Sequence, residues 1–476
     1  MPKKKPRRFS LAAACFLGVM TFPAQAEQFD PFATQGLVAD SPASSIGRNI
    51  LTSPCSDAHA YPASLSLTDV VERALCNNPQ TREAWANARF QAAQVGVGKS
   101  AYLPSVSVAA SESRNRNSGG TAATSYNQQN LSASLSYLLY DFGARDAALE
   151  NARQVLAALN ATQDATIQTV FLAGVQAYYQ LFATRAAVDS AVEAEKSALE
   201  SLNAAAARYS VGSGTPADKL QAQTAYSQAV LNRIQAEGDA RNAEGVLANT
   251  MGADADRPFQ IVSPTLQVPD AQFGRDIAKL IEQARRQRPD LAAAQAQVEA
   301  AQANVDAARA AGMPTISLGA SAGRSDTSIS DPNNTSSLGV SISFPLFTGY
   351  NTTYRVRAAR EQVDVRLAQR ERTSQQIALD VWKAYQAVVT GNQAVKTSAD
   401  LVASAVHSEQ VALGRFKAGV GSILDLLTAQ SALASARLQN IQSVYNWHIA
   451  KATLAQSMGS LDFSTLAASA PQQTNP

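Results

Sequence analysis

The chain has 476 residues, and its 40 Lys and Arg against 38 Asp and Glu give a formal net charge of +2 at pH 7. No basic run occurs beyond the first ten positions, which argues against a nucleic-acid partner. The three histidines, His59, His407 and His448, lie in unrelated contexts, without a phosphate loop, nucleophile elbow or metal-ligand spacing. We therefore expect no enzyme, no cofactor and no metal, with His407 and His448 on helix surfaces.

Residues 1–26 have the features of a secretory signal peptide. Basic residues precede the apolar run 9–22, and Ala24-Gln25-Ala26 supplies a small-x-small cleavage site. The run is too short for a transmembrane helix, which needs about 20 residues. Lipidation at Cys15 is the alternative, but Ala12 stands three residues before it, where a lipoprotein signal carries Leu. We expect export of the chain without a lipid anchor.

Residues 27–64 are rich in Pro, Ser and Asp and have no period, which predicts an extended segment on the surface. Cys55 and Cys76 are the two cysteines left after cleavage, and an even pair in an exported chain favours a disulfide. Two free thiols are the alternative. A capped helix is expected to end near Asn77, and a second helix, from about residue 80, is stopped by Pro104.

After Pro104 the hydrophobic period changes from about 3.6 to 2. Apolar and small polar residues alternate before and after a polar loop at 112–129, which predicts two antiparallel strands of about ten residues within 105–140. A second strand pair is predicted within 315–346, around a loop at 325–337. One face of each strand is almost purely Ser and Gly, and the length suits a tilted crossing of outer-membrane lipid. A small soluble sheet packed on helices is the alternative.

Two stretches match position by position. The first reads Arg208-Tyr209-x-x-Gly212-x-Gly214-x-x-x-Asp218, and the second reads Arg415-Phe416-x-x-Gly419-x-Gly421-x-x-x-Asp425, so each position recurs 207 residues later. In each, glycines able to take positive φ separate two helices, and Thr215 and Ser422 open capping boxes with the aspartates. The chain is therefore a tandem duplication of a unit that contains a helical hairpin.

Alanine-rich stretches at 145–209 and 352–416 lead into these turns, and return helices are predicted at 217–250 and 422–457. Each 65-residue stretch would span about 100 Å as a helix. Within 381–416, apolar residues at alternating spacings of four and three predict a coiled-coil seam. A shorter helix and a return helix, placed end to end, are long enough to run beside each long helix.

These patterns divide the chain into six parts: signal peptide 1–26, extended segment 27–64, first repeat 65–251, equatorial linker 252–275, second repeat 276–461 and disordered tail 462–476. Four strands cannot close a membrane barrel, because the smallest such barrels use about eight. Several chains must therefore contribute strands, and three copies would supply twelve.

The twin turns, the strand ends Phe142-Gly143 and Phe347-Thr348-Gly349, and the helix starts Asn78-Pro79 and Arg288-Pro289 resemble the TolC family of outer-membrane exit ducts. The resemblance covers about 65–461. It implies a membrane α+β fold, in which a homotrimer forms a 12-stranded β-barrel in the outer membrane of a Gram-negative bacterium. A long periplasmic α-helical barrel continues from it.

The resemblance also implies partners and a function. The partners are a periplasmic adaptor protein and an inner-membrane transporter of the ABC or RND type. The implied function is the exit duct of a tripartite export system, and the missing lipoprotein signal favours type I protein secretion over drug efflux. A periplasmic coiled-coil scaffold is the alternative of a different class.

By resemblance, Asp425 belongs to the pore constriction, with Thr428 and Asp218 nearby. Gly421 stands where the best-known members carry a bridging arginine, Phe416 replaces a tyrosine and Thr428 replaces an aspartate, so fewer salt bridges should hold the closed state. Helix capping is the alternative role of Asp425. Adaptor docking is expected on the exposed turns, with plain turn chemistry as the alternative; the turn residues are Arg208, Gly212, Gly214, Arg415, Gly419 and Gly421.

Overall fold

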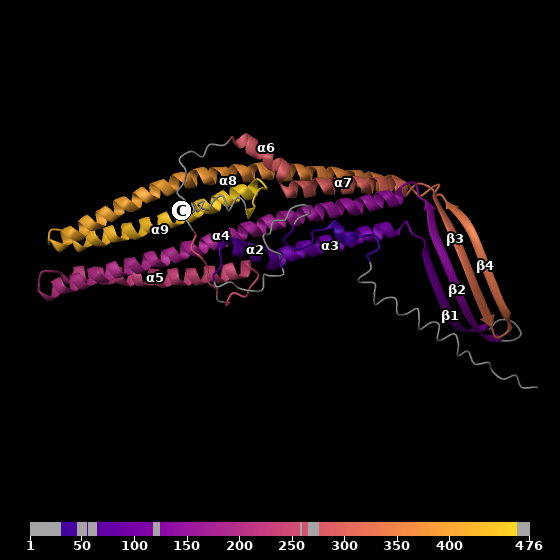
Figure 1. Ribbon diagram of the computed structural model, residues 1–476, viewed down its shortest axis with the longest axis horizontal. Coiled ribbons are helices and arrows are strands. Elements are labelled where there is room, and N and C mark those ends of the chain that lie inside the picture. The colour runs from indigo at the N-terminus through magenta and orange to yellow at the C-terminus, as the bar shows by residue number, and fades with distance from the viewer. Residues whose placement is uncertain are drawn as a thin grey trace, which may run out of the picture.

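A computed structural model describes residues 30–44, 55, 64–117, 124–257, 259–264 and 276–463. The predicted signal peptide, parts of the N-terminal segment and linker, and the tail from residue 464 lie outside them. The chain forms a long helical body, with a sheet at one end and two hairpin turns at the other (Figure 1).

Two uninterrupted helices of 67 residues run through the body, α4 (Ala144–Ser210) and α8 (Asn351–Lys417). Both lie within one residue of their predicted ends. Six shorter helices accompany them: α2 Leu67–Asn77, α3 Pro79–Ser100, α5 Pro216–Thr250, α6 Ile277–Gln287, α7 Pro289–Ala310 and α9 Ile423–Ser457. Within the described ranges, no helix is both long and apolar enough to cross a membrane.

The shorter helices lie beside the long ones in two rows. Helices α3 and α5 follow one another along α4, and α7 and α9 follow one another along α8 (Figure 1). The rows join because α4 also packs against α7 and α9. The order across the body is therefore α3, α4, α7, α8 near the sheet and α5, α4, α9, α8 near the turns.

The two repeats close at the middle of the body by matching contacts. Asn78 Nδ2 donates to the carbonyl of Thr250 at 3.1 Å, and Arg288 Nη1 donates to that of Ser457 at 3.4 Å. After each return helix comes a glycine with positive φ, and a Cβ at Gly252 would stand only 2.6 Å from the Asn77 carbonyl oxygen. Glycine is thus required there by both conformation and close approach.

The sheet is an antiparallel meander in the order β1-β2-β3-β4. Its strands are β1 Ser105–Asn117, β2 Thr124–Tyr140, β3 Thr315–Thr327 and β4 Ser330–Ser343. Strands from the two repeats pair between β2 and β3, so β1 and β4 are the two edges.

The strands are longer than the predicted ten residues, with 13, 17, 13 and 14 residues. The strand pairing continues through much of the polar stretches 112–129 and 325–337, which were predicted as loops. For example, Gln129 lies opposite Glu112, and its side-chain amide donates to the Glu112 carboxylate at 3.2 Å. The loop prediction was wrong because a ladder needs backbone groups, which polar residues also supply. At its other end, β4 stops before the predicted residue 346, since Pro345 has no N–H to donate.

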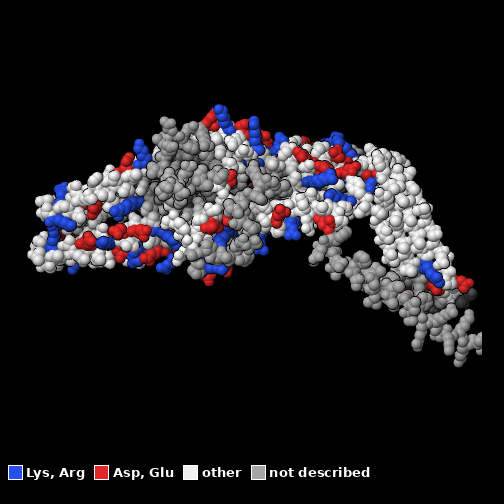
Figure 2. All heavy atoms as spheres, in the orientation of Figure 1, with Lys and Arg blue, Asp and Glu red and all other residues white. Residues whose placement is uncertain are grey.

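The two faces of the sheet differ in chemistry. On one face the apolar side chains are exposed: Val106 is 69% and Ile342 70% exposed. On the other face hydroxyl groups pair across the strands, with the Ser107 and Ser134 oxygens 2.7 Å apart. Charged side chains gather on the helical body and at the far end of the sheet, leaving an uncharged band between them (Figure 2).

The described part of the N-terminal segment lies against α3 and α4. It contains a short 3-10 helix, η2 (Thr34–Leu37), which the prediction of a purely extended segment missed. Trp85 Nε1 donates to the Ala39 carbonyl at 2.8 Å, and Asn160 Nδ2 donates to the Leu37 carbonyl at 3.1 Å. The segment thus fastens α3 to α4.

The described parts of the linker and tail are packed on the central core. Leu65 and Ile261 form a parallel bridge, as short extended pieces would. The tail was predicted to be disordered from residue 462, yet the Phe463 ring lies 5.0 Å from that of Phe171. The boundary was misplaced because Phe463 supplies an aromatic side chain that packs on the core.

Cys55 and Cys76 form a disulfide, the pairing that the even count favoured, with 5.5 Å between their Cα atoms. It joins the N-terminal segment to α2. The closed loop has a sequence separation of 21, for which chain entropy gives about 3 kcal/mol of stabilisation. We expect Cys76→Ala to lower the unfolding free energy by that amount, measured by denaturant titration. Reductant should destabilise the wild type but not the variant, and equal sensitivity of both would contradict a structural role.

His448 is buried, not on the helix surface as predicted, and only 4% of it is exposed. Its ring stacks on Tyr179 at 5.0 Å and lies edge-on to Trp447 at 4.9 Å. Next to His448, Trp447 of α9 packs against Gly391 of α8. A Cβ at Gly391 would stand only 3.3 Å from Trp447 Cδ1, so the glycine lets the two helices approach closely. The sequence pattern around His448 did not reveal this packing.

Burial, aided by the charge of Lys451, lowers the pKa of His448 from its ordinary 6.5 to about 4. Between these values the unfolded chain binds a proton that the folded chain does not, so stability is full above pH 6.5 and falls as the pH drops toward 4. The loss reaches about 3 kcal/mol. We expect His448→Phe to flatten this pH dependence in thermal unfolding, and an unchanged slope would contradict it.

Candidate functional site at the hairpin tips

Each hairpin reverses direction through a glycine in the left-handed conformation, Gly212 (φ 74) after α4 and Gly419 (φ 77) after α8. The second glycine of each turn behaves differently from the prediction, because Gly214 and Gly421 lie outside the positive-φ region. A Cβ at Gly421 would instead stand 3.0 Å from the Cβ of Arg415. Close packing on the helix end, not backbone conformation, therefore disfavours a larger residue there.

The return helices begin with different caps. In α5 the cap is reciprocal: the Asp218 N–H donates to Thr215 Oγ1, and the Thr215 N–H donates to the Asp218 carboxylate, both at 3.1 Å. In α9 the Asp425 N–H donates to Ser422 Oγ at 3.1 Å, but the reverse bond is not formed. The predicted capping box at Ser422 is thus only half present, and the Asp425 carboxylate is exposed.

A small apolar cluster holds the two hairpins together just behind the turns. Phe416 is 5% exposed and packs with Ile423, Leu426, Ala205 and Ala222. Because these residues come from all four helices, the ends of the two hairpins form one unit.

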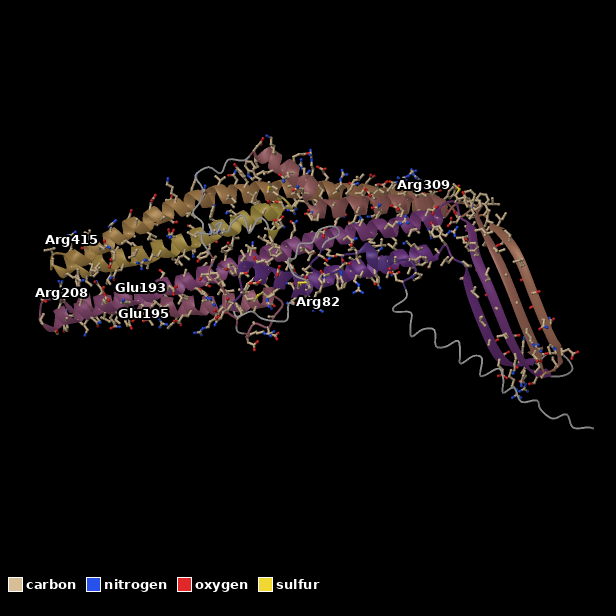
Figure 3. All side chains as sticks on the ribbon, in the orientation of Figure 1. Arg82, Glu193, Glu195, Arg208, Arg309 and Arg415 are labelled. Carbon is tan, nitrogen blue, oxygen red and sulfur yellow. A yellow bond between two sulfur atoms is a disulfide. The ribbon has the colours of Figure 1, made fainter. Side chains whose placement is uncertain are left out.

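Arg208 reaches across from the first hairpin to the second. Its guanidinium lies 4.2 Å from the centre of the Phe416 ring, and its Nη2 donates to the Phe416 carbonyl at 2.5 Å. Arg415 is exposed at the end of the second hairpin, and Figure 3 shows the two arginines at neighbouring tips. The structure therefore gives these twin residues different surroundings, which the sequence did not reveal.

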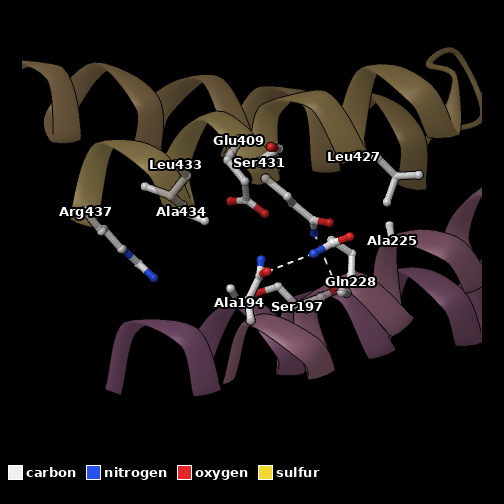
Figure 4. A pocket seen from close by; sticks show the side chains of 14 residues that line it. Ala194, Ser197, Ala225, Gln228, Glu409, Leu427, Ser431, Leu433, Ala434 and Arg437 are labelled. Atoms are coloured by element: carbon white, nitrogen blue, oxygen red, sulfur yellow. Dashed lines mark hydrogen bonds between the residues drawn. The ribbon is translucent and has the colours of Figure 1, made fainter. Parts of the chain in front are cut away.

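A polar contact lies farther along the same seam. Ser201 is 3% exposed, and its hydroxyl donates to Gln430 Oε1 at 3.2 Å. Beside it, a cavity of about 180 Å³ opens between the hairpins, lined by alanines and by polar side chains that include Gln228 and Arg437 (Figure 4). Gln430 recurs as Gln223 in the matching stretches, but sequence analysis did not single out Ser201, although it has an identical twin at 408.

The structure brings the predicted mouth residues only partly together. Asp425 and Thr428 lie one turn apart on α9, and both are exposed. Asp218 lies on the other hairpin, and its carboxylate is engaged in the α5 cap. The constriction role of these residues and the docking role of the turns remain predictions.

A profile of the family described as "Outer membrane efflux protein" matches residues 70–253 and 280–460. The two matched segments correspond to the two repeats of the duplication. The fold is therefore that of an outer-membrane channel of a Gram-negative bacterium, with a large periplasmic helical part, and not that of an enzyme. This chain belongs to the outer membrane efflux protein family, whose TolC-like members are homotrimers that work with adaptor proteins and inner-membrane transporters.

Several curated proteins align along most of the chain. It is 30% identical over 413 residues to protein CyaE of Bordetella pertussis, covering 86% of this chain and 87% of that protein. It is 26% identical over 402 residues to the outer membrane efflux protein BepC of Brucella suis, covering 83% and 85%. The toluene efflux pump outer membrane protein TtgC of Pseudomonas putida is 27% identical over 78% of each chain.

Solved structures agree on the fold. The Campylobacter jejuni outer membrane channel CmeC matches with a TM-score of 0.74 at 20% identity, covering 84% of this chain and 88% of that one. The open state of the Neisseria gonorrhoeae channel MtrE matches with a TM-score of 0.71 at 23% identity, covering 87% and 95%. These likenesses establish the channel fold. The family and the curated relatives place the chain among the exit channels of tripartite systems and leave its cargo open.

Proposed function

We propose that three copies of this chain form an exit duct in which the sheets close a 12-stranded β-barrel in the outer membrane and the helices continue as a tube across the periplasm. The observation that carries the proposal is the sheet, which has an exposed apolar face and two open edges, β1 and β4. An open edge in lipid would leave backbone groups unpaired. Pairing β4 of one copy with β1 of the next satisfies both edges.

The lining of the proposed duct follows from the two faces of the sheet. If the apolar face contacts lipid, the Ser and Gly face lines the lumen, where paired hydroxyls such as Ser317 and Ser341, 2.8 Å apart, leave small neutral side chains. Within the uncharged band, such a wall would hold no fixed charge.

The proposed partners meet the duct at these tips. A periplasmic adaptor would contact the exposed glycine turns at Gly212 and Gly419. An inner-membrane transporter would load the duct through the adaptor. We propose protein as the cargo and an ABC transporter as the pump, because Ala12 stands in place of the Leu of a lipoprotein signal.

Small-molecule efflux with an RND transporter is the second candidate, favoured by relatives that are described as efflux proteins. Deleting the gene separates the two. Loss of a protein from the culture supernatant supports protein export, whereas sensitivity to toluene, dyes or antibiotics with an unchanged supernatant supports efflux.

The duct itself is tested on protein extracted from outer membranes with detergent. We expect a heat-modifiable trimer on gels and single-channel conductance in planar bilayers. Recovery in the soluble periplasmic fraction would instead indicate a coiled-coil scaffold and would overturn the proposal.

A further inference from the structure

The three arginines of the sheet lie on its apolar face. They are Arg114 and Arg116 of β1 and Arg324 of β3, and the four strands contain no lysine. Because successive side chains of a strand alternate between faces, Arg114 and Arg116 lie on the same face as Val108. Arg324 joins them there, since it lies opposite Leu131, the last apolar residue of that face in β2.

The acidic side chains of β1 and β3 share this face. Glu112 lies opposite Gln129, and Gln129 lies opposite Asp326, so the two carboxylates occupy one row across the sheet. Asp331, near the β3–β4 turn, is the one further charged residue of the four strands. In β1, β2 and β3 the face of paired hydroxyls carries neutral side chains, such as Gln128. Solubility alone would allow charge on either face, so its restriction to the apolar face indicates a charged partner on that side.

The arginines lie at and beyond the far border of the apolar band. On β2 the band runs from Tyr140 to Leu131, about 23 Å along the membrane normal for strands tilted by about 40°. An outer-membrane barrel has an apolar band of about 25 Å. Arg324, opposite Leu131, therefore stands at the border of the hydrocarbon. Arg114 lies opposite Asn127, about 10 Å farther out, at the depth of lipid headgroups.

The guanidinium groups are available to an external anion. All three arginines are exposed, and none forms an ion pair or a hydrogen bond with another described residue. The nearby Glu112 carboxylate accepts from the Gln129 amide at 3.2 Å instead. Arg114 and Arg116 lie about 7 Å apart on one face, so their charges repel, and an anion bound between them would relieve the repulsion. Phosphate suits them because its oxygens accept paired N–H donors from a guanidinium.

We infer that Arg114, Arg116 and Arg324 bind the phosphate groups of the phosphorylated glycolipid that forms the outer leaflet of the outer membrane. The lipid is the source of phosphate that this position favours, because the arginines continue the apolar face outward to the depth of the headgroups. The inference rests on the proposed barrel, which puts the apolar face in lipid, and adds a headgroup site on its outer surface.

Native mass spectrometry of the detergent-extracted trimer tests the site, with diphosphoryl lipid A as the probe. Arg114→Gln, Arg116→Gln and Arg324→Gln together should weaken its binding about tenfold, while binding of zwitterionic phosphatidylethanolamine stays unchanged. Equal binding of lipid A by this variant and the wild type would overturn the inference. Displacement of lipid A by inorganic phosphate, at an ionic strength where sodium chloride has no effect, would indicate a soluble-anion site and would also overturn it.

The matched control moves one charge without removing it. Arg114→Asn with Asn115→Arg keeps the composition and the net charge but transfers the guanidinium to the hydroxyl face. This exchange should weaken lipid A binding as much as Arg114→Gln does, and binding at the wild-type level would show that net charge alone matters. The spectra also report the trimer mass, so lipid binding is compared only between variants that stay trimeric. A wild-type trimer that does not bind lipid A overturns the inference and leaves the duct standing, whereas a wild-type monomer overturns both.

Discussion

Replacing Asp425 by Asn is expected to remove most of the cation selectivity of the channel while leaving the trimer intact. The carboxylate is exposed and does not complete the helix cap, so its charge is available to the mouth. Three carboxylates about 6 Å apart would repel by about 3 kcal/mol per pair at an effective dielectric constant of about 20. Such a ring attracts cations, and the amide keeps the size while removing the charge.

The measurement is the reversal potential in planar bilayers under a salt gradient, together with block by multivalent cations. Asp218→Asn removes the same charge from the twin position, where the carboxylate serves the α5 cap, and so tests the third predicted constriction residue. Because that carboxylate is engaged in the cap, we expect Asp218→Asn to lower the cation selectivity less than Asp425→Asn does. If Asp425→Asn changes neither the selectivity nor the block, Asp425 acts only at the start of helix α9.

Bulky substitution at the turn glycines is expected to abolish export while trimers still form. Gly212 and Gly419 have positive φ, where a side chain costs roughly 1 to 2 kcal/mol, too little to unfold helices of this length. A Cβ at Gly212 would meet no other atom of the chain within 4 Å, so a leucine there disturbs what docks from outside. Export by Gly212→Leu and Gly419→Leu should fall to the level of a gene deletion.

Two controls separate docking from backbone strain. Gly414→Leu adds the same side chain inside α8, where a Cβ also meets no atom within 4 Å, and export should continue. Gly419→Asn adds a side chain that tolerates positive φ. Loss of export in Gly419→Asn supports docking, whereas normal export would show that only the backbone conformation matters.

The sequence predicted the parts of the fold that depend on local chemistry. The ends of α4 and α8 follow from alanine-rich periodicity and from the glycines after them, and the cap at Thr215 follows from the short spacing to Asp218. The duplication could be detected from the sequence because residues that match at a separation of 207 positions are found by comparing the chain with itself. Strand lengths were underestimated, since the alternation of apolar residues marks only the apolar band of the sheet and not the whole ladder.

The parts that depend on packing between distant segments were not predicted. His448 lies on a helix whose apolar pattern gives no single buried face, and its burial depends on Gly391 of α8 and Tyr179 of α4. The contact of Arg208 with Phe416 joins positions 208 residues apart, on two hairpins that the sequence treats as equivalent. Only the relative placement of the hairpins makes one arginine a contact residue and leaves the other exposed.

The continuity of α4 has a mechanical consequence. Its neighbours break at the middle of the body, at Asn78 and Gly252, but α4 passes from Tyr178 in the central core to Ser210 at the tip without interruption, over about 50 Å. A rigid rod of that length converts a tilt of about 5° at the core into a displacement of about 4 Å at its end. Small repacking around Tyr178 is therefore magnified at the hairpin tip, where the mouth of the proposed duct would lie.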